Sequence, residues 1–327
     1  HVCYLGRPVA VSSLLPALKT VRPTIMLSVP AVIEKIYKNK IVPSFEKNKI
    51  VAKLYKVPIT RKLLHRIAGK KLMDTFGGRI RFFGIGGAKL SPDVERFLME
   101  GKFPYAIGYG MTETSPLIAG APPKKSRFQS TGPKIEGIEV KLINVDPATG
   151  IGEIVTKGPH VMKGYYKNEE LTKAAFTEDG FFKTGDCGSM DKDGYLYIKG
   201  RNKNVIVGAS GENIYPEDIE FVLNKHPLVL ESLVIERDKK LVALVKLDED
   251  SIEKEPASEN SESSPYAKTL DDIRNFVNSQ VNKFSKLKAI EQITSLEKTA
   301  SQKIKRFLYN NSGKGETMND TPEKKDK

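Results

Sequence analysis

A short stretch at Tyr109–Leu117, "YGMTETSPL", combines residue types that could bind a nucleotide. The ring of Tyr109 could stack on a base, the hydroxyl of Thr112 could hydrogen-bond a phosphate, and Glu113 could hold Mg²⁺, a hard cation that prefers oxygen ligands. Each residue also has a structural alternative: an aromatic ring at the edge of the core, a helix cap and a first-turn carboxylate. Their occurrence together favours the nucleotide interpretation.

A second candidate is the turn Gly86, Gly87 and Ala88 in "GIGGAKL", which leaves backbone exposed where a flat base could approach. An ordinary turn from a strand to a helix is the alternative. In "FFKTGDCG", the carboxylate of Asp186 could accept two hydrogen bonds from the hydroxyls of a ribose, and an Asp turn explains the same residue. Taken alone, none of these motifs identifies a function.

Basic residues complete the candidate set. Arg201 and Lys203, in "GRNKN", could contact a phosphate or ribose and form a hinge, or could belong to a solvated linker. Lys303 lies in "KTASQKIKR", where a solvated surface role is the alternative. The Gly-rich stretch that starts at Gly208, "GASGENIYPEDIE", ends in Pro and acidic residues that predict a helix start.

The elements that must position these residues alternate between strands and helices. The apolar runs "TIMLSV", "RIRFFGIGG" and "YAIGYG" predict buried strands, and residues 92–100 predict a helix between two of them. This order indicates an α/β fold with a parallel sheet, in which ligands collect at the carboxyl ends of the strands. Both "GIGGAKL" and "GYGMTET" would lie at such ends.

Beyond these strands the pattern changes twice. Short alternating segments separated by glycine turns, from about Gly132 to Gly200, predict a small β subdomain. We therefore expect residues 1–199 to be part of a large domain, 200–204 to be a hinge and 205–309 to be a mobile α+β domain. Residues 248–268 are rich in Ser and Glu and predict a flexible insertion, and residues 310–327 predict a disordered tail.

Composition limits the class of protein. Fifty-three Lys and Arg against forty Asp and Glu give a net charge of +13, which favours anionic partners. No interleaved basic and aromatic motif occurs, so nucleic acid is not an expected partner. Cys3 and Cys187 have no metal-ligand spacing, which favours a reduced, cytoplasmic protein without structural zinc. The positive charge also makes peripheral contact with the inner face of a membrane an expectation, while no apolar run is long enough to span one.

The order of the motifs is more specific than any one of them. Gly-Gly-Ala, Tyr-Gly-x-Thr-Glu, Thr-Gly-Asp, Gly-Arg-x-Lys, Gly-Glu-Asn and Lys-Thr-x-Ser-x-Lys follow one another along the chain. In this order and approximate spacing they resemble the adenylate-forming, or AMP-binding, enzymes, which include acyl-CoA synthetases, luciferases and peptide-synthetase adenylation domains. The chain is most similar to bacterial long-chain fatty acid CoA ligases, from Arg22 to about Tyr309.

The resemblance implies a role for each candidate. Glu113 would coordinate Mg²⁺, Lys203 would be the hinge, and Lys303 would enter the site for the first half-reaction, so that the catalytic set is Lys303, Thr112 and Glu113. The nucleotide-binding residues it implies are Gly86, Gly87, Ala88, Tyr109, Gly110, Thr112, Asp186 and Arg201. The loop implied to face CoA after domain rotation contains Gly208, Ser210 and Gly211.

The implied activity is ATP-dependent conversion of a long-chain fatty acid to acyl-AMP, followed by transfer to the CoA thiol. ATP, Mg²⁺ and CoA would be required, and a medium-chain or aryl acid is an alternative substrate because the acyl pocket cannot be assigned. One departure concerns the Ser/Thr/Gly-rich phosphate loop of the family, which does not occur in these residues. We interpret His1 as a fragment boundary, and a noncatalytic nucleotide-binding remnant is the second alternative.

Overall fold

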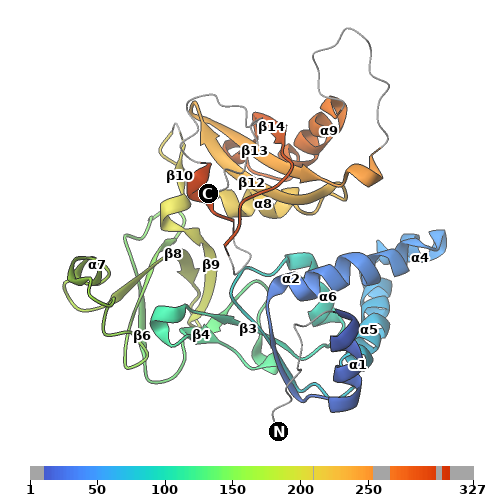
Figure 1. The fold of residues 1–327 in the computed structure, drawn as a ribbon, viewed down its shortest axis with the longest axis horizontal. Coiled ribbons are helices and arrows are strands. Elements are labelled where there is room, and N and C mark those ends of the chain that lie inside the picture. Colours follow the sequence, from blue (N-terminus) through green and yellow to red (C-terminus); the bar gives the residue numbers. More distant parts are fainter. Residues whose placement is uncertain (1–10, 209, 253–265, 300–303, 310–327) are drawn as a thin grey trace, which may run out of the picture. The chain divides into compact units, whose positions relative to one another are not determined.

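The computed structural model describes residues 11–208, 210–252, 266–299 and 304–309. By its internal contacts the chain divides into two compact units, His1–Ile198 and Lys199–Lys327 (Figure 1). Each unit has its own sheets and hydrophobic core.

The first unit is built around a four-stranded sheet in the order β1-β2-β3-β4. Strands β1, β2 and β3 are parallel, with Ile85 paired to both Ser28 and Ile107, and β4 is antiparallel to β3. The strands span Ile25–Ser28 (β1), Phe82–Ile85 (β2), Tyr105–Tyr109 (β3) and Ala119–Gly120 (β4). The α/β class and the parallel pairing predicted from the apolar runs are thereby confirmed.

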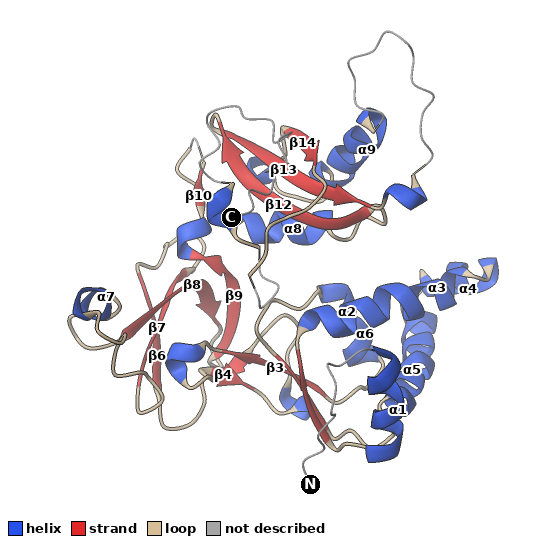
Figure 2. Cartoon of the chain, in the orientation of Figure 1, coloured by secondary structure: helices blue, strands red, loops and turns tan. Residues whose placement is uncertain are grey.

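Helices pack against this sheet and enclose a core that includes Phe83, Phe97 and Leu98 (Figure 2). Proline occupies the first turn of several of them, where its missing N–H is not needed. Helices α5 and α6 approach closely, because a Cβ at Gly69 would lie 2.6 Å from the carbonyl oxygen of Gly101. The helical segments span Val11–Val21 (α1), Pro30–Ile36 (α2), Tyr37–Ile41 (the π-helix η1), Val42–Glu46 (α3), Lys49–Tyr55 (α4), Pro58–Thr75 (α5) and Pro92–Glu100 (α6).

The same unit contains a second sheet of five strands in the order β5-β9-β8-β7-β6. Its inner face contributes Ile154 and Leu196 to a core that also contains Tyr109 and Ile118 from the region around β3 and β4. The elements span Gly132–Pro133 (β5), Glu139–Ile143 (β6), Gly152–Lys157 (β7), Glu169–Ala174 (α7), Phe182–Met190 (β8) and Tyr195–Arg201 (β9). This shared core joins the end of β3 to the second sheet.

The second unit has an α+β fold with a three-stranded sheet in the order β12-β13-β14. Strands β12 and β13 form an antiparallel hairpin, and β14 runs parallel to β13. Helices α8 and α9 contribute Ile219, Leu223, Ile273 and Val277 to its core. The elements span Ile206–Val207 (β10), Asn213–Ile214 (β11), Pro216–Leu223 (α8), Val229–Arg237 (β12), Lys240–Leu247 (β13), Ala267–Asn278 (α9) and Ala289–Gln292 (β14).

Two sequence-based predictions meet the limits of the described residues. Most of the predicted insertion 248–268 lies outside them, but Glu249–Ser251 form the 3-10 helix η5 and α9 begins at Ala267, so both ends have regular secondary structure. The predicted tail 310–327 lies entirely outside the described residues. Among the helices that the structure describes, none has the length and apolar character needed to cross a bilayer.

Candidate active site

Glycines at the end of β2 allow the chain to pass close to its neighbours. The N–H of Gly86 donates to the carbonyl oxygen of Ser28 at 3.2 Å, and a Cβ at Gly86 would lie 3.3 Å from the carbonyl oxygen of Gly108 in β3. Gly87 has φ +89°, and both it and Ala88 are exposed. The turn therefore presents bare backbone beside the end of β3, as an approaching planar base requires.

The loop after β3 is held by its own backbone and by one threonine. A Cβ at Gly110 would lie 1.8 Å from the carbonyl oxygen of Pro116, so only glycine fits there. The buried hydroxyl of Thr114 accepts from the N–H of Met111 at 3.1 Å and also lies 3.3 Å from the Pro116 carbonyl. Thr114 was not among the candidates, although a third polar residue directly after Thr112 and Glu113 was a usable signal.

This anchoring leaves the candidate side chains of the 3-10 helix η2, Thr112–Thr114, available. Thr112 is exposed, and Glu113 is half-buried with its carbonyl oxygen accepting from the N–H of Met162 at 2.8 Å. The Tyr165 hydroxyl donates to Oε1 of Glu113 at 3.2 Å, and burial together with this carboxylate raises the pKa of Tyr165. Tyr165 is a second neighbour that sequence reasoning missed, because 52 residues separate it from Glu113.

The chemistry of Glu113 limits what metal it could hold. Among the described residues no group of three or more His, Cys, Asp and Glu side chains is arranged to bind a metal ion. A single carboxylate nevertheless fits Mg²⁺, which is commonly held by one or two protein carboxylates together with substrate phosphates and water. Glu113 therefore fits a magnesium ion that is shared with a nucleotide.

Two predicted nucleotide residues meet across the two sheets of the first unit. The hydroxyl of Tyr109, at the end of β3, donates to Oδ2 of Asp186 in β8 at 2.9 Å. Both side chains are buried, with 9% and 7% of their surface exposed. The N–H of Asp186 also donates to Oγ1 of Thr184 at 3.1 Å, which fixes the backbone that carries the carboxylate. A tyrosine ring and a carboxylate that are 77 residues apart in sequence are thus placed side by side.

The basic candidates follow Ile198, the residue at which the first unit ends within β9. Arg201 is the last residue of β9 and is half-buried, and Lys203 lies exposed in the following 3-10 helix η4, Asn202–Asn204. The amide of Asn204 donates to Oε1 of Glu217 in α8 at 2.7 Å, which ties this short helix to the second unit. The assignment of 200–204 as a hinge stays a prediction.

The loop predicted to face CoA connects β10 to β11. The N–H of Gly208 donates to the carbonyl of Glu212 at 2.8 Å, and the N–H of Gly211 donates to the carbonyl of Gly208 at 2.9 Å. The N–H of Ser210 donates to the carboxylate of Glu212 at 3.1 Å. Gly211 has φ +82°, a conformation that favours glycine. These bonds close the turn, in which Gly208 is half-buried while Ser210 and Gly211 are exposed.

Lys303 lies outside the described residues, but the chain on both sides of its segment is anchored. Lys298 and Ile304 form an antiparallel bridge, and the N–H of Lys305 donates to the carbonyl of Glu297 at 2.8 Å. The Lys298 ammonium pairs with Glu231 of β12 at 2.8 Å. Lys298 and Ile304, which flank Lys303 in the sequence, are thus held in place within the second unit.

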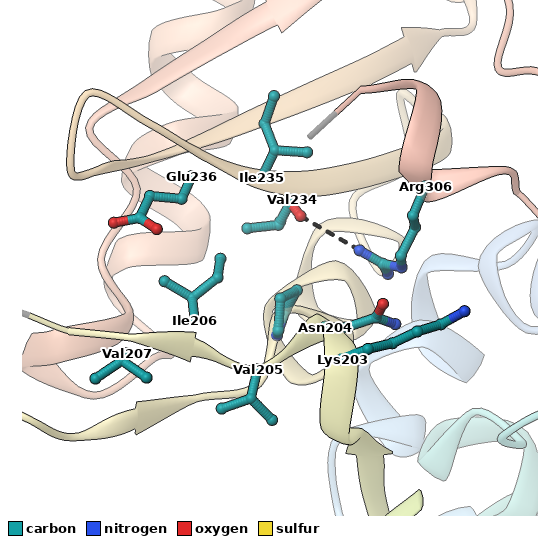
Figure 3. A pocket seen from close by; sticks show the side chains of 10 residues that line it. Lys203, Asn204, Val205, Ile206, Val207, Val234, Ile235, Glu236 and Arg306 are labelled. Carbon is teal, nitrogen blue, oxygen red and sulfur yellow. Dashed lines mark hydrogen bonds between the residues drawn. The ribbon is translucent and has the colours of Figure 1, made fainter. Parts of the chain in front are cut away.

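Arg306, in the 3-10 helix η7 (Arg306–Leu308), provides a further anchor. Its guanidinium pairs with the carboxylate of Glu220 in α8 and donates to the carbonyl of Val234 at 3.3 Å. Glu220 also accepts from the N–H of Val234 at 2.7 Å, and burial raises its pKa while Arg306 opposes that rise. Figure 3 shows Arg306 directed into a pocket of about 360 Å³, which Lys203 and Asn204 also line.

Comparison with known families gives two matches along the chain. The family described as "AMP-binding enzyme" matches residues 1–166, and the family described as "AMP-binding enzyme C-terminal domain" matches residues 218–303. The two matched segments fall in the first and the second unit, respectively. The resemblance expected from the order of the motifs is therefore confirmed.

Among curated proteins, the chain is similar to a long-chain-fatty-acid–CoA ligase of Mycobacterium bovis, with 31% identity over 263 residues. The alignment covers 74% of this chain and 43% of the relative, so the chain spans less than half the length of that relative. Because this relative is so much longer, its long-chain fatty acid substrate is only a hypothesis for this chain.

Among solved structures, the chain resembles the o-succinylbenzoate CoA synthetase of Bacillus subtilis. In complex with its acyl-adenylate intermediate, that protein matches with a TM-score of 0.67 and 26% identity, over 94% of this chain and 55% of that chain. In complex with ATP and a magnesium ion, it matches with a TM-score of 0.66 and 25% identity, over 90% and 53% of the two chains. The fold therefore matches a protein whose structure contains ATP and a magnesium ion, two of the ligands expected for this chain.

Proposed function

The chain belongs to the AMP-binding enzyme family, and from that premise we propose that the protein containing it is an acid–CoA ligase. In the first step, a carboxylate oxygen of the acid attacks the α-phosphorus of ATP, a P–O bond forms, and pyrophosphate leaves. In the second step, the CoA sulfur attacks the acyl carbonyl, its proton is released, and AMP leaves. Both half-reactions bring anions together, so positioning and charge neutralisation are the main demands on the protein.

The residues of the first unit would hold the nucleotide. The turn Gly86–Ala88 would take the adenine together with Tyr109, and the Tyr109–Asp186 hydrogen bond carries this assignment because it places a ring beside a carboxylate. Asp186 would accept from the ribose hydroxyls, and Thr112 would donate to the α-phosphate. Glu113 would hold magnesium, which when bound neutralises phosphate charge.

The second unit would supply different residues to the site in the two steps. Lys303 would donate to the reacting phosphate and carboxylate oxygens in the first step. Arg201 would contact the ribose, and rotation about Lys203 would replace Lys303 with the loop of Gly208, Ser210 and Gly211 for the second step. The anchors of Lys298 and Arg306 support this role, because both belong to the second unit and the chain between them, which includes Lys303, belongs to it as well.

We propose a long-chain fatty acid as the substrate, because the long-chain relative is similar over 74% of this chain. The resemblance to an o-succinylbenzoate synthetase favours an aryl acid as the alternative. Acid-dependent exchange of labelled pyrophosphate into ATP, measured with palmitate, decanoate, benzoate and o-succinylbenzoate on the intact protein that contains this chain, decides between them. Fastest exchange with palmitate supports the proposal, whereas fastest exchange with an aryl acid overturns the substrate.

Two variants test the roles rather than the substrate. Lys303→Ala should abolish exchange but preserve thioester formation from supplied acyl-AMP, and equal loss of both reactions would refute the role of Lys303. Asp186→Asn should weaken AMP binding by about tenfold, the value of one charge-assisted hydrogen bond. AMP binding without exchange for any acid would make the protein a noncatalytic nucleotide-binding remnant.

A further inference from the structure

One segment of the first unit is strongly basic. No Asp or Glu occurs between Glu46 and Asp74, a stretch that forms α4, α5 and the turn between them. It contains nine cationic side chains: Lys47, Lys49, Lys53, Lys56, Arg61, Lys62, Arg66, Lys70 and Lys71. We call residues 47–73 the basic hairpin. The basic hairpin therefore contains cationic side chains and no acidic ones, whereas the whole chain contains both.

The outer face of α5 also exposes an apolar row. Ile59, Leu63 and Ile67 are 81%, 58% and 51% exposed. They recur at every fourth position, so they lie one above another along the helix. Scattered exposed apolar residues are ordinary, but a row on one helix face is a contiguous surface.

A basic row runs directly beside the apolar one. Lys62, Arg66 and Lys70 are exposed and follow the same four-residue spacing, one position before Leu63, Ile67 and Lys71. Helix α4 repeats the arrangement in shorter form, with Ile50 and Leu54 exposed beside Lys49 and Lys53. Figure 1 shows α4 extending from the end of the helical layer of its unit, next to α5. Two helices therefore present the same paired rows.

A pocket adjoins the basic row. It has a volume of about 480 Å³ and lies where α5 meets α6, with Lys62, Arg66, Arg96 and Lys102 among its lining residues. The one acid that lines it, Glu100, is paired with Arg61 through two hydrogen bonds of 2.9 and 3.1 Å. The pocket is thus lined by these cations together with Met99 and Phe128, and the negative charge of Glu100 is already compensated.

We propose that the basic hairpin docks on an anionic lipid bilayer. The apolar rows would lie in the plane of the interface, and the pocket would take one phosphate headgroup. The exposed lysines and Arg66 would face lipid phosphates, whereas Arg61 stays paired with Glu100. A protein partner fits less well, because burying this many cations in an interface requires as many matching anions, whereas a bilayer supplies them laterally. The inference is independent of the proposed activity, since it uses no residue of the nucleotide site.

Cosedimentation of the intact protein that contains this chain with vesicles tests the proposal. We expect binding to vesicles of phosphatidylcholine with 30% phosphatidylglycerol and at least about tenfold weaker binding to pure phosphatidylcholine, with a decline as salt increases. Equal binding to both vesicle types, or none to either, would overturn it. Inorganic phosphate at millimolar concentration should not release the protein, because the bilayer and not a free ion is the ligand.

Two triple variants locate the surface. Lys62→Gln with Arg66→Gln and Lys70→Gln should lower the partition coefficient by about a hundredfold, and Ile59→Ser with Leu63→Ser and Ile67→Ser by at least about tenfold. Matched controls change other exposed residues of the same chemical type: Lys163, Lys167 and Lys173 to Gln, and Val145, Leu171 and Leu230 to Ser. Vesicle binding that falls as much in the controls as in the hairpin variants would refute the location.

A second copy of the chain is the competing occupant of the apolar row. Sedimentation velocity without lipid distinguishes it, because a dimer that the Ile59, Leu63 and Ile67 triple variant abolishes would assign the row to self-association. Vesicle binding by a chain that stays monomeric supports the bilayer. Every residue changed in these variants is exposed, so we expect them to keep the wild-type unfolding temperature. Measuring that temperature checks that each variant is folded.

Discussion

The hydroxyl of Tyr109 donates a 2.9 Å hydrogen bond to Oδ2 of Asp186, joining the end of the parallel sheet to the antiparallel sheet of the same unit. The contact serves two purposes at once. It orients a ring and a carboxylate that are both assigned to the nucleotide. It also links two sheets that meet through apolar packing and through a backbone hydrogen bond from Ile135 to Ile118. Loss of the hydroxyl should therefore affect both stability and binding.

Tyr109→Phe removes this bond without changing the shape of the ring. Because the buried carboxylate of Asp186 then lacks one donor, we expect the free energy of unfolding to fall by roughly 1–3 kcal/mol and AMP affinity to fall about tenfold. Chemical denaturation and isothermal titration measure the two effects. Tyr197→Phe is the matched control, because its hydroxyl donates to the more exposed Asp191 at 3.2 Å. A control that loses as much AMP affinity as the variant would contradict the assignment.

The loop of the second unit offers a test of the CoA-binding hypothesis. Gly211→Ala places a side chain at φ +82°, where nothing obstructs the new methyl group, so the cost is backbone strain of about 1 kcal/mol. We expect slower thioester formation from supplied acyl-AMP and unchanged pyrophosphate exchange. Gly194→Ala, at φ +80° and with equally open surroundings, carries the same strain in the turn between β8 and β9. It should leave both half-reactions at the wild-type rate.

The elements around the nucleotide site could be predicted because their signals are local. The apolar run before Gly86 and the alternation in "EVKLI" each specify a strand through a few neighbouring residues. Residues 92–100 form the predicted helix with the same bounds, since Pro92 marks its first turn and Gly101 follows its end.

The partners of the site residues could not be predicted in the same way. Tyr109 and Asp186 were each candidates, but their hydrogen bond depends on how two sheets pack, which no short pattern encodes. The same holds for Tyr165 beside Glu113 and for Arg306 beside Glu220, which are 52 and 86 residues apart. Sequence order identified the family, whereas contacts between distant segments had to come from the structure.

The buried imidazole of His65 should make the first unit sensitive to acid. Burial lowers the pKa of His65, although the nearby Glu100 carboxylate opposes the change, and its ring bonds the Tyr55 hydroxyl at 3.0 Å. As pH falls below about 6.5, the unfolded state takes up a proton that the folded state does not, so stability is lost down to the lowered pKa.

His65→Gln keeps a polar partner for Tyr55 but cannot titrate in this range. Between pH 7 and pH 5, we expect amide protection in α5 and α6 to fall less in the variant than in the wild type. Hydrogen exchange, corrected for intrinsic rates, measures this protection. His226→Gln serves as the control, because burial also lowers the pKa of His226 but its ring lies in the second unit. An unchanged pH profile for α5 and α6 in the His65 variant would contradict the prediction.

The pair of Arg306 and Glu220 should dominate the stability of the segment that follows Lys303. The two side chains are 17% and 11% exposed, and Arg306→Met leaves a buried carboxylate without its cation. We expect a loss of about 3–5 kcal/mol at pH 8, and we expect Glu220→Gln in the same chain to restore part of it. Urea denaturation of the wild type, both single variants and the double variant measures the coupling.

The pH dependence of that loss separates charge from packing. Burial raises the pKa of Glu220 above its usual value, and removal of Arg306 raises it further, so stability is retained at low pH and lost as pH rises through the raised pKa. The deficit of Arg306→Met should therefore shrink toward pH 4.5, where a protonated Glu220 no longer needs a cation. A deficit of constant size from pH 4.5 to pH 8 would mean that Arg306 acts through packing alone. In that case, if Arg306→Met also slowed acyl-adenylate formation, the slower rate could not be attributed to loss of the Arg306 charge near Lys303.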